Sequence, residues 1–96
     1  MKNFIKDSII DRFGNIIGDV TIDEEGAFYY GSFSPKSLSS SLKDLFDEYE
    51  YSVNNQILSK LDDIQAAILA HGLAMKSNLK PIKEIQLFGS EITLWF

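Results

Sequence analysis

The first third of the chain alternates between apolar and polar residues, which is the period of a β-strand. The clearest alternation covers residues 16–22, and apolar segments before and after it cover residues 5–13 and 27–33. A glycine-asparagine pair at 14–15 and an acidic stretch at 23–26 separate these segments and have the composition of tight turns. We therefore expect three antiparallel strands joined by hairpin loops.

In the middle of the chain, apolar residues recur every three or four positions, as they do on one side of a helix. They are Leu38, Leu42, Leu45, Phe46, Tyr49, Val53, Ile57, Leu61, Ile64 and Ile68. Because the stripe stays in phase, the pattern predicts one long or kinked helix over about residues 38–71. Ser52, Asn54 and Asn55 are better helix caps than interior residues, so two helices with a break there are the alternative. A straight helix of this length would reach about 50 Å and overhang its own core.

The last third returns to apolar segments at 82–88 and 91–96, on either side of Gly89 and Ser90. The elements then follow the order β-β-β-α-β-β. This order predicts an α+β fold, in which a five-stranded, mainly antiparallel sheet packs one face against the helix. With no linker or repeat, we expect residues 1–96 to form a single domain.

Hairpin loops fix strand register, so they predict which side chains share a face of the sheet. We expect Ile9 to oppose Val20, Val20 to oppose Tyr29, and Gly18 to meet Gly31. The core face then contains Ile9, Phe13, Ile16, Val20, Ile22, Tyr29 and Phe33, with Ile85, Leu87, Ile92 and Leu94 from the second hairpin. The opposite face contains Ile10, Ile17, Phe28, Tyr30, Phe88 and Trp95.

Four of these opposite-face residues are aromatic, although a sheet face in contact with water is normally polar. We therefore interpret Phe28, Tyr30, Phe88 and Trp95 as a partner-binding surface. The alternative is that the helix, a loop or a folded-over part of the sheet covers them as a second small core. For Gly18 and Gly31, a coiled sheet is the expected explanation and a shallow ligand groove the alternative.

The chain has a formal net charge of −5, and Arg12 is its one arginine. This charge and the presence of a single arginine argue against nucleic-acid binding. Asp44, Asp47 and Glu48 share one face of the predicted helix, and this acidic face suits a basic partner.

No catalytic motif appears in the chain. His71, the single histidine, lies at a predicted helix end, and the serines at 37 and 39–41 fit a helix start better than a nucleophile motif. There is no cysteine, and the carboxylates lack the spacing of a calcium loop. We expect no catalytic residues, no metal site, no cofactor and no enzymatic activity.

No apolar run approaches the roughly 18 residues that a membrane-spanning helix needs, and charges near the N-terminus do not fit a signal peptide. We therefore expect a cytoplasmic protein that does not bind membranes.

These observations predict a small acidic protein that binds another protein without catalysis. In size, acidity and layout the chain resembles small bacterial immunity proteins and antitoxins, which neutralise a toxin by covering its active site. One alternative is a structural or regulatory subunit that forms homodimers or larger homo-oligomers. Another is a small-ligand-binding domain or enzyme with a pocket near Tyr29, Tyr30 and Gly31.

Overall fold

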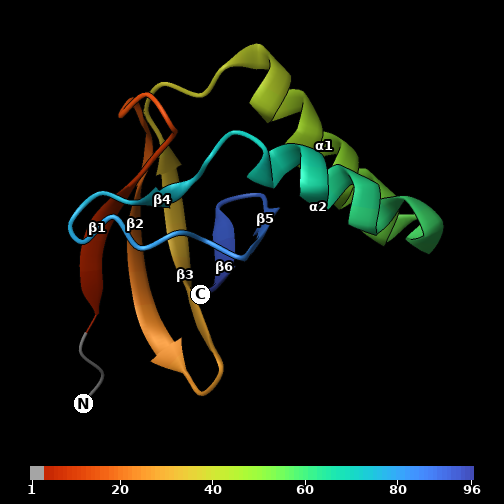
Figure 1. Ribbon diagram of the computed structural model, residues 1–96. Helices are drawn as coiled ribbons and strands as arrows, with labels where there is room; N and C mark the ends of the chain where they lie inside the picture. The colour runs from red at the N-terminus through yellow and green to blue at the C-terminus, as the bar shows by residue number, and fades with distance from the viewer. Residues whose placement is uncertain (1–3) are drawn as a thin grey trace.

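The computed structural model describes residues 4–96 as an α+β fold, in which two helices pack against a curled antiparallel sheet of six strands (Figure 1). The strands are β1 (Ile5–Ile10), β2 (Ile16–Glu25), β3 (Phe28–Pro35), β4 (Ala74–Met75), β5 (Glu84–Phe88) and β6 (Glu91–Trp95). The helices are α1 (Ser40–Asn54) and α2 (Leu61–Leu69), and the short 3-10 turn η1 (Leu58–Lys60) precedes α2. The strand order across the sheet is β4-β1-β2-β3-β6-β5.

The general class agrees with the sequence pattern, but the expectation of five strands is wrong. The additional strand is β4, which has two residues and pairs with Ile9 and Ile10 of β1. A strand this short has no hydrophobic period, so only its pairing with β1 reveals it.

The expected first strand over residues 5–13 is also too long, because β1 ends at Ile10. The carboxylate of Asp11 accepts hydrogen bonds from the N–H groups of Phe13 and Asn15, which turns the chain immediately after the strand. Phe13 is consequently 80% exposed and does not belong to the core. A bulge between Ile9 and Ile10 shifts the register with β2, and Ile17, expected on the opposite face, is buried.

The acidic stretch expected to form the second turn is instead the end of β2, which continues to Glu25. Val20 therefore pairs with Phe33 rather than Tyr29, and Gly18 pairs with Pro35 rather than Gly31. In the first hairpin, Ile9 pairs with Gly18 rather than Val20. These registers differ from expectation by even numbers of residues, so most side chains remain on the expected face.

The prediction of one long or kinked helix over 38–71 is wrong, because the chain reverses between α1 and η1. Gln56 has a positive φ of 57°, and the Asn55 side chain donates a hydrogen bond to the Tyr51 carbonyl at 2.8 Å. Asn55 therefore caps α1, as the alternative with a break anticipated. The two helices form a hairpin whose far end projects beyond the sheet (Figure 1).

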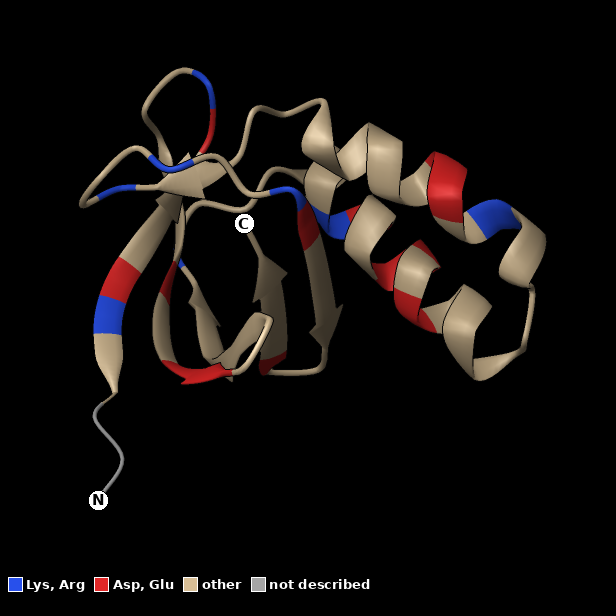
Figure 2. Ribbon diagram, turned by 60° about the horizontal axis from the view of Figure 1, so that its bottom comes forward, with Lys and Arg blue, Asp and Glu red and all other residues tan. Residues whose placement is uncertain are grey.

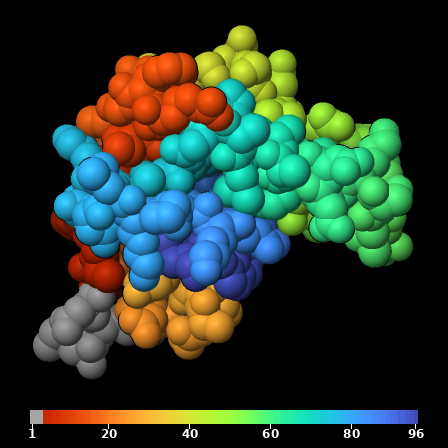
Figure 3. Space-filling model, viewed as in Figure 1, coloured from red at the N-terminus to blue at the C-terminus, as the bar shows by residue number. Residues whose placement is uncertain are grey.

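The inner face of the sheet forms the core with the apolar sides of both helices. Strand residues such as Val20, Ile92 and Leu94 pack there against Phe46 and Ile68. The segment between α2 and β5 crosses in front of β2 and β3, and Figure 3 shows its cyan and light-blue atoms over this face. Helices and connecting segment together therefore shield the inner face from water.

Side chains occupy hydrogen-bonding positions at the edge strand β5 and at the part of β1 that precedes its pairing with β4. On β5, Gln65 of α2 donates to the Ile85 carbonyl at 2.9 Å and accepts from the Ile85 N–H at 2.8 Å. On β1, the Asp7 carboxylate accepts from the N–H groups of Ser8 and Ser77. These contacts take main-chain positions that another strand would otherwise use.

Within residues 4–96, no helix has both the length and the apolar character needed to cross a membrane.

Candidate interaction surface

Among residues 4–96, neither helix forms a layer over the outer face of the sheet, whose side chains range from half-buried to exposed. Strand pairing arranges residues of β2, β3, β6 and β5 in rows across this face. We call the row formed by Glu25, Phe28, Trp95 and Glu84 the aromatic row. The next row contains Asp23, Tyr30, Thr93 and Gln86. Neighbouring strands lie about 4.8 Å apart, so each row crosses the face in three such steps.

The aromatic row places two rings between two carboxylates. Phe28 pairs with Glu25 and Trp95 pairs with Glu84. The rings of Phe28 and Trp95 touch in a tilted arrangement, with their centroids 5.7 Å apart. Both residues are half-buried, so their rings support each other and still reach solvent.

Tyr30 extends the aromatic surface into the second row, and it is 41% exposed. A hydrogen bond to the Glu91 carboxylate raises the pKa of the Tyr30 phenol, with smaller contributions from desolvation and the charge of Glu91. Tyr30 is thus tied to an acidic residue of β6 and presents its ring to solvent.

This part of the outer face is acidic. It contains the carboxylates of Asp23, Glu25, Glu84 and Glu91, and residues 21–25, 28–32, 84–88 and 91–95 include no lysine or arginine. Figure 2 shows acidic residues in red at the turn joining β2 to β3 and at the starts of β5 and β6. Negative charge and aromatic rings therefore lie on the same surface.

The four aromatic residues that the sequence predicts to bind a partner lie in two different environments. Phe28, Tyr30 and Trp95 lie near one another on the outer face, whereas Phe88 packs against Tyr49 of α1, with ring centroids 6.3 Å apart. The Tyr49 hydroxyl also accepts a hydrogen bond from Gln86 at 3.2 Å. Phe88 therefore joins β5 to the helices, and the exposed aromatic surface centres on the other three residues.

The predicted acidic residues Asp44, Asp47 and Glu48 lie on a separate element, α1, and all three are exposed. Lys43 forms an ion pair with Asp47 at 2.8 Å, one helical turn away. Tyr51, which is 61% exposed, continues the same helical stripe. Sequence reasoning alone misses Glu25, which the register of β2 with β3 places opposite Phe28. It also misses Glu91, which the pairing of β3 with β6 brings to Tyr30.

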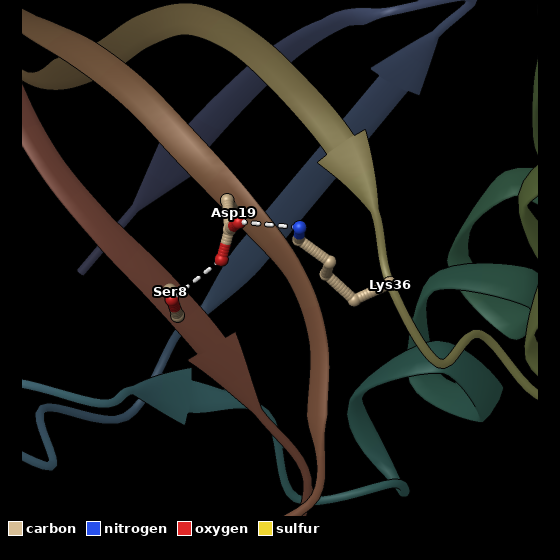
Figure 4. Close-up of polar contacts among 3 residues, drawn as sticks. All are labelled: Ser8, Asp19 and Lys36. Carbon is tan, nitrogen blue, oxygen red and sulfur yellow. Dashed lines mark hydrogen bonds and ion pairs between the residues drawn. The ribbon is translucent and has the colours of Figure 1, made fainter.

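A second polar cluster lies nearer the start of β2 (Figure 4). The Ser8 hydroxyl donates to Asp19 at 2.7 Å, and the Lys36 ammonium lies 3.5 Å from the other carboxylate oxygen. The hydrogen bond from Ser8 lowers the pKa of Asp19 against an opposing effect of desolvation, and the charge of Lys36 lowers it further. Such a carboxylate is a weak proton acceptor, so these contacts tie strands together better than they activate the serine.

Two other residues considered as catalytic candidates from the sequence, His71 and Ser39, make hydrogen bonds within the fold. The His71 carbonyl accepts a hydrogen bond from the Arg12 N–H at 3.0 Å, and Ser39 caps α1 through the Leu42 N–H at 3.3 Å. Among residues 4–96, no group of three His, Asp or Glu side chains has the arrangement of a metal site.

The shallow ligand groove, given as the alternative explanation for Gly18 and Gly31, does not form at these glycines. A Cβ on Gly31 would overlap the Thr21 carbonyl oxygen, and one on Gly18 would overlap the Phe33 ring, so neighbouring groups already fill both positions. Tyr29 lines a cavity of about 110 Å³ on the inner side, and Tyr30 lies on the other face. This cavity is smaller than the roughly 300 Å³ at which ligand pockets usually begin.

Comparison with family models, with curated proteins and with solved structures found no match for this chain.

Proposed function

We propose that this chain is a non-catalytic protein-binding module, comparable in role to a small immunity or antitoxin-type inhibitor, and that it contacts a basic partner through its outer sheet face. One observation carries the proposal: among residues 4–96, Phe28, Trp95 and Tyr30 lie together on the outer sheet face, half-buried to exposed, and Glu84 and Glu91 lie beside them. Aromatic residues contribute strongly to binding when a partner desolvates them.

The charge of this face selects among partner classes. Nucleic acid and anionic lipid both present phosphates, which the formal net charge of −5 of the chain disfavours. A protein with a basic patch would be attracted and steered toward the same face. A protein partner with positive surface charge is therefore the best match.

The same charges disfavour self-association through this face. In a symmetric dimer each face meets its own copy, so Glu84 and Glu91 would approach equivalent carboxylates across the interface. Side chains also occupy main-chain hydrogen-bonding positions at Ile85 of the edge strand β5 and at Ser8 of β1. Both features favour a heterologous partner over the homo-oligomeric alternative.

The first test is the solution mass by light scattering over at least a tenfold concentration range. We expect a monomer, because repulsion opposes the symmetric use of the acidic face. A stable dimer that Thr93→Lys separates would contradict the proposal and assign the outer face to self-assembly.

The second test uses a tagged chain to capture a partner from cells that carry the gene, followed by direct affinity measurement with the purified partner. Thr93→Lys places a long cation in the middle of the face, and Ser59→Lys makes the same change on the exposed 3-10 turn. We expect Thr93→Lys to weaken binding by about tenfold or more, while Ser59→Lys retains it. Equal affinities for the two variants would place the binding surface elsewhere.

A further inference from the structure

We propose that the turn between β1 and β2, together with the end of α2, binds the C-terminal residue of another polypeptide, with an apolar side chain and a free carboxylate. Residues 11–13 of the turn and residues 70–71 after α2 line a concavity of about 290 Å³. This turn and the turn before Phe28 lie at opposite ends of β2 (Figure 1). The site is therefore separate from the aromatic residues of the outer face and goes beyond the proposed function.

Hydrogen bonds hold the turn in place before a ligand binds. The Arg12 N–H donates to the His71 carbonyl at 3.0 Å, and the Asp11 N–H donates to the Asn15 carbonyl at 3.0 Å. A Cβ added to Gly72 would lie 2.8 Å from the Arg12 Cβ, so the turn packs directly against the chain after α2. Figure 3 shows the orange-red atoms of the turn beside the teal atoms of this segment. A preformed site lowers the entropic cost of binding.

Phe13 gives the site an apolar wall. Its exposed fraction of 80% is the largest of any large hydrophobic residue within residues 4–96. The Asp11 carboxylate accepts a hydrogen bond from the Phe13 N–H at 2.9 Å, which fixes the main chain that carries the ring. Ala70 adds a methyl group to the same concavity. An apolar side chain placed against this wall removes the ring from water, and this burial favours binding.

Arg12 gives the site a cation for the carboxylate. It is exposed, and within residues 4–96 its guanidinium forms no ion pair. The Asp11 carboxylate also lines the concavity, but its two oxygens accept N–H groups of Phe13 and Asn15 inside the turn. A guanidinium forms two parallel hydrogen bonds with a carboxylate. His71 lines the concavity as well, and its ring has at least one N–H to donate.

The size of the concavity selects the kind of ligand. Its volume of about 290 Å³ is at the lower end of the range for ligand pockets, which begins at roughly 300 Å³. A C-terminal residue has its carboxylate and its side chain on one Cα, so it presents both groups within this space. An aspartate or glutamate inside a chain would need a neighbouring residue to supply the apolar contact. A single terminal residue is therefore the best match.

The probe is a short peptide, acetyl-serine-glycine-leucine, with a free carboxyl group. Its C-terminal amide lacks the charge, and the same peptide ending in serine lacks the apolar side chain. A fourth peptide, acetyl-leucine-aspartate-serine amide, carries an apolar group and a carboxylate inside the chain. Two-dimensional NMR of the isotopically labelled full chain measures the affinity of each peptide and shows which amide groups respond.

We expect the acid peptide to give saturable shifts at the amides of residues 11–14 and 70–72. The amide peptide should bind about fivefold more weakly and the serine peptide about threefold more weakly. No saturable shift up to about 5 mM acid peptide, or shifts confined to other residues, would overturn the inference. Equal affinity for the acid and amide peptides would also overturn it. Equal affinity for the aspartate peptide would exclude a terminal residue as the specific ligand.

Matched variants test the two groups separately. Arg12→Gln removes the cation, and Lys60→Gln removes an exposed cation from η1. Arg12→Gln should weaken the acid peptide about fivefold and abolish its advantage over the amide peptide, whereas Lys60→Gln should change its affinity less than twofold. Equal losses in these two variants would overturn the inference. Thermal melting verifies that both are folded.

A second pair of variants addresses the apolar wall. Phe13→Ala should weaken the acid peptide about threefold, and Leu58→Ala, at a residue of η1 that is 64% exposed, should leave it unchanged. Equal affinities for these two variants would show that the ring makes no contact with the ligand and would overturn the inference.

Thr93→Lys separates this site from the proposed function. The substitution changes the outer face, so the acid peptide should bind within about twofold of its affinity for the native chain. If Thr93→Lys changes the peptide's affinity as much as Arg12→Gln does, the peptide contacts the outer face and the inference is wrong. The response of the captured partner to Thr93→Lys decides the proposed function independently.

Discussion

The inner and outer faces of the sheet are built from alternate residues of the same strands. The inner residues are buried in the core, whereas the outer residues are half-buried to exposed. On β6, Ile92 and Leu94 are completely buried under the helices and connecting segment, while Thr93 and Trp95 remain partly accessible on the other side. The inner residues lose their contact with water on folding and hold the layers together. The outer residues keep part of their contact with water, so each gains less from burial on folding.

The sharpest test of this difference uses adjacent residues on opposite faces. Ile92→Ala should lower the free energy of unfolding by about 2–5 kcal/mol, because it leaves a cavity in the core. Thr93→Ala should lower it by less than about 1 kcal/mol. Chemical denaturation of both variants measures the contrast, and similar losses would show that the outer face also carries the fold.

Gly31→Ala tests how closely β2 and β3 pack on the inner face of the sheet. The added methyl group would overlap the main chain of Thr21 on the neighbouring strand, and main-chain atoms cannot rotate away. We expect a loss of about 1–3 kcal/mol in the free energy of unfolding. Ser32→Ala, at the exposed neighbouring position, should be nearly neutral. A stable Gly31→Ala protein would mean that β2 and β3 can separate locally.

Gln65→Ala tests the contact between α2 and the edge strand β5. The substitution removes both hydrogen bonds to the Ile85 main chain and should cost about 1–3 kcal/mol. Gln65→Glu retains the acceptor for the Ile85 N–H and should have a smaller effect. Hydrogen exchange at the Ile85 amide measures the change directly, and unchanged protection in Gln65→Ala would contradict the role given to this side chain.

Asp19→Asn should have the smallest and most pH-dependent effect. The hydrogen bond from Ser8 lowers the pKa of Asp19 below its ordinary value of 3.8 in the folded protein. The ionised carboxylate therefore stabilises the fold above that value, and this stabilisation is lost as pH falls through the lower folded-state pKa. The difference in melting temperature between native protein and variant should be largest near neutral pH and narrow in acid. A constant difference would exclude this titration as its source.

Sequence reasoning predicted only part of the candidate interaction surface. Alternation along the strands correctly places Phe28, Tyr30 and Trp95 on the face opposite the core, because side-chain direction depends on local backbone geometry. The contact between Phe28 and Trp95 depends on β3 pairing with β6, across a long stretch of intervening sequence. The packing of Phe88 on Tyr49 likewise depends on where α1 meets β5.

By itself, the sequence determined the α+β class and most of the division between the two faces of the sheet. Both properties follow from the hydrophobic period, which is two residues in a strand and about 3.6 residues in a helix. A register shift by an even number of residues leaves each side chain on the same face of the sheet. Tertiary structure alone decided the extra strand β4, the reversal after Asn55 and the register of β2 with β3. The apolar stripe permitted one helix or two, and folding back lets the apolar sides of both helices join the core. Such choices depend on burial summed over distant segments, which no local pattern contains.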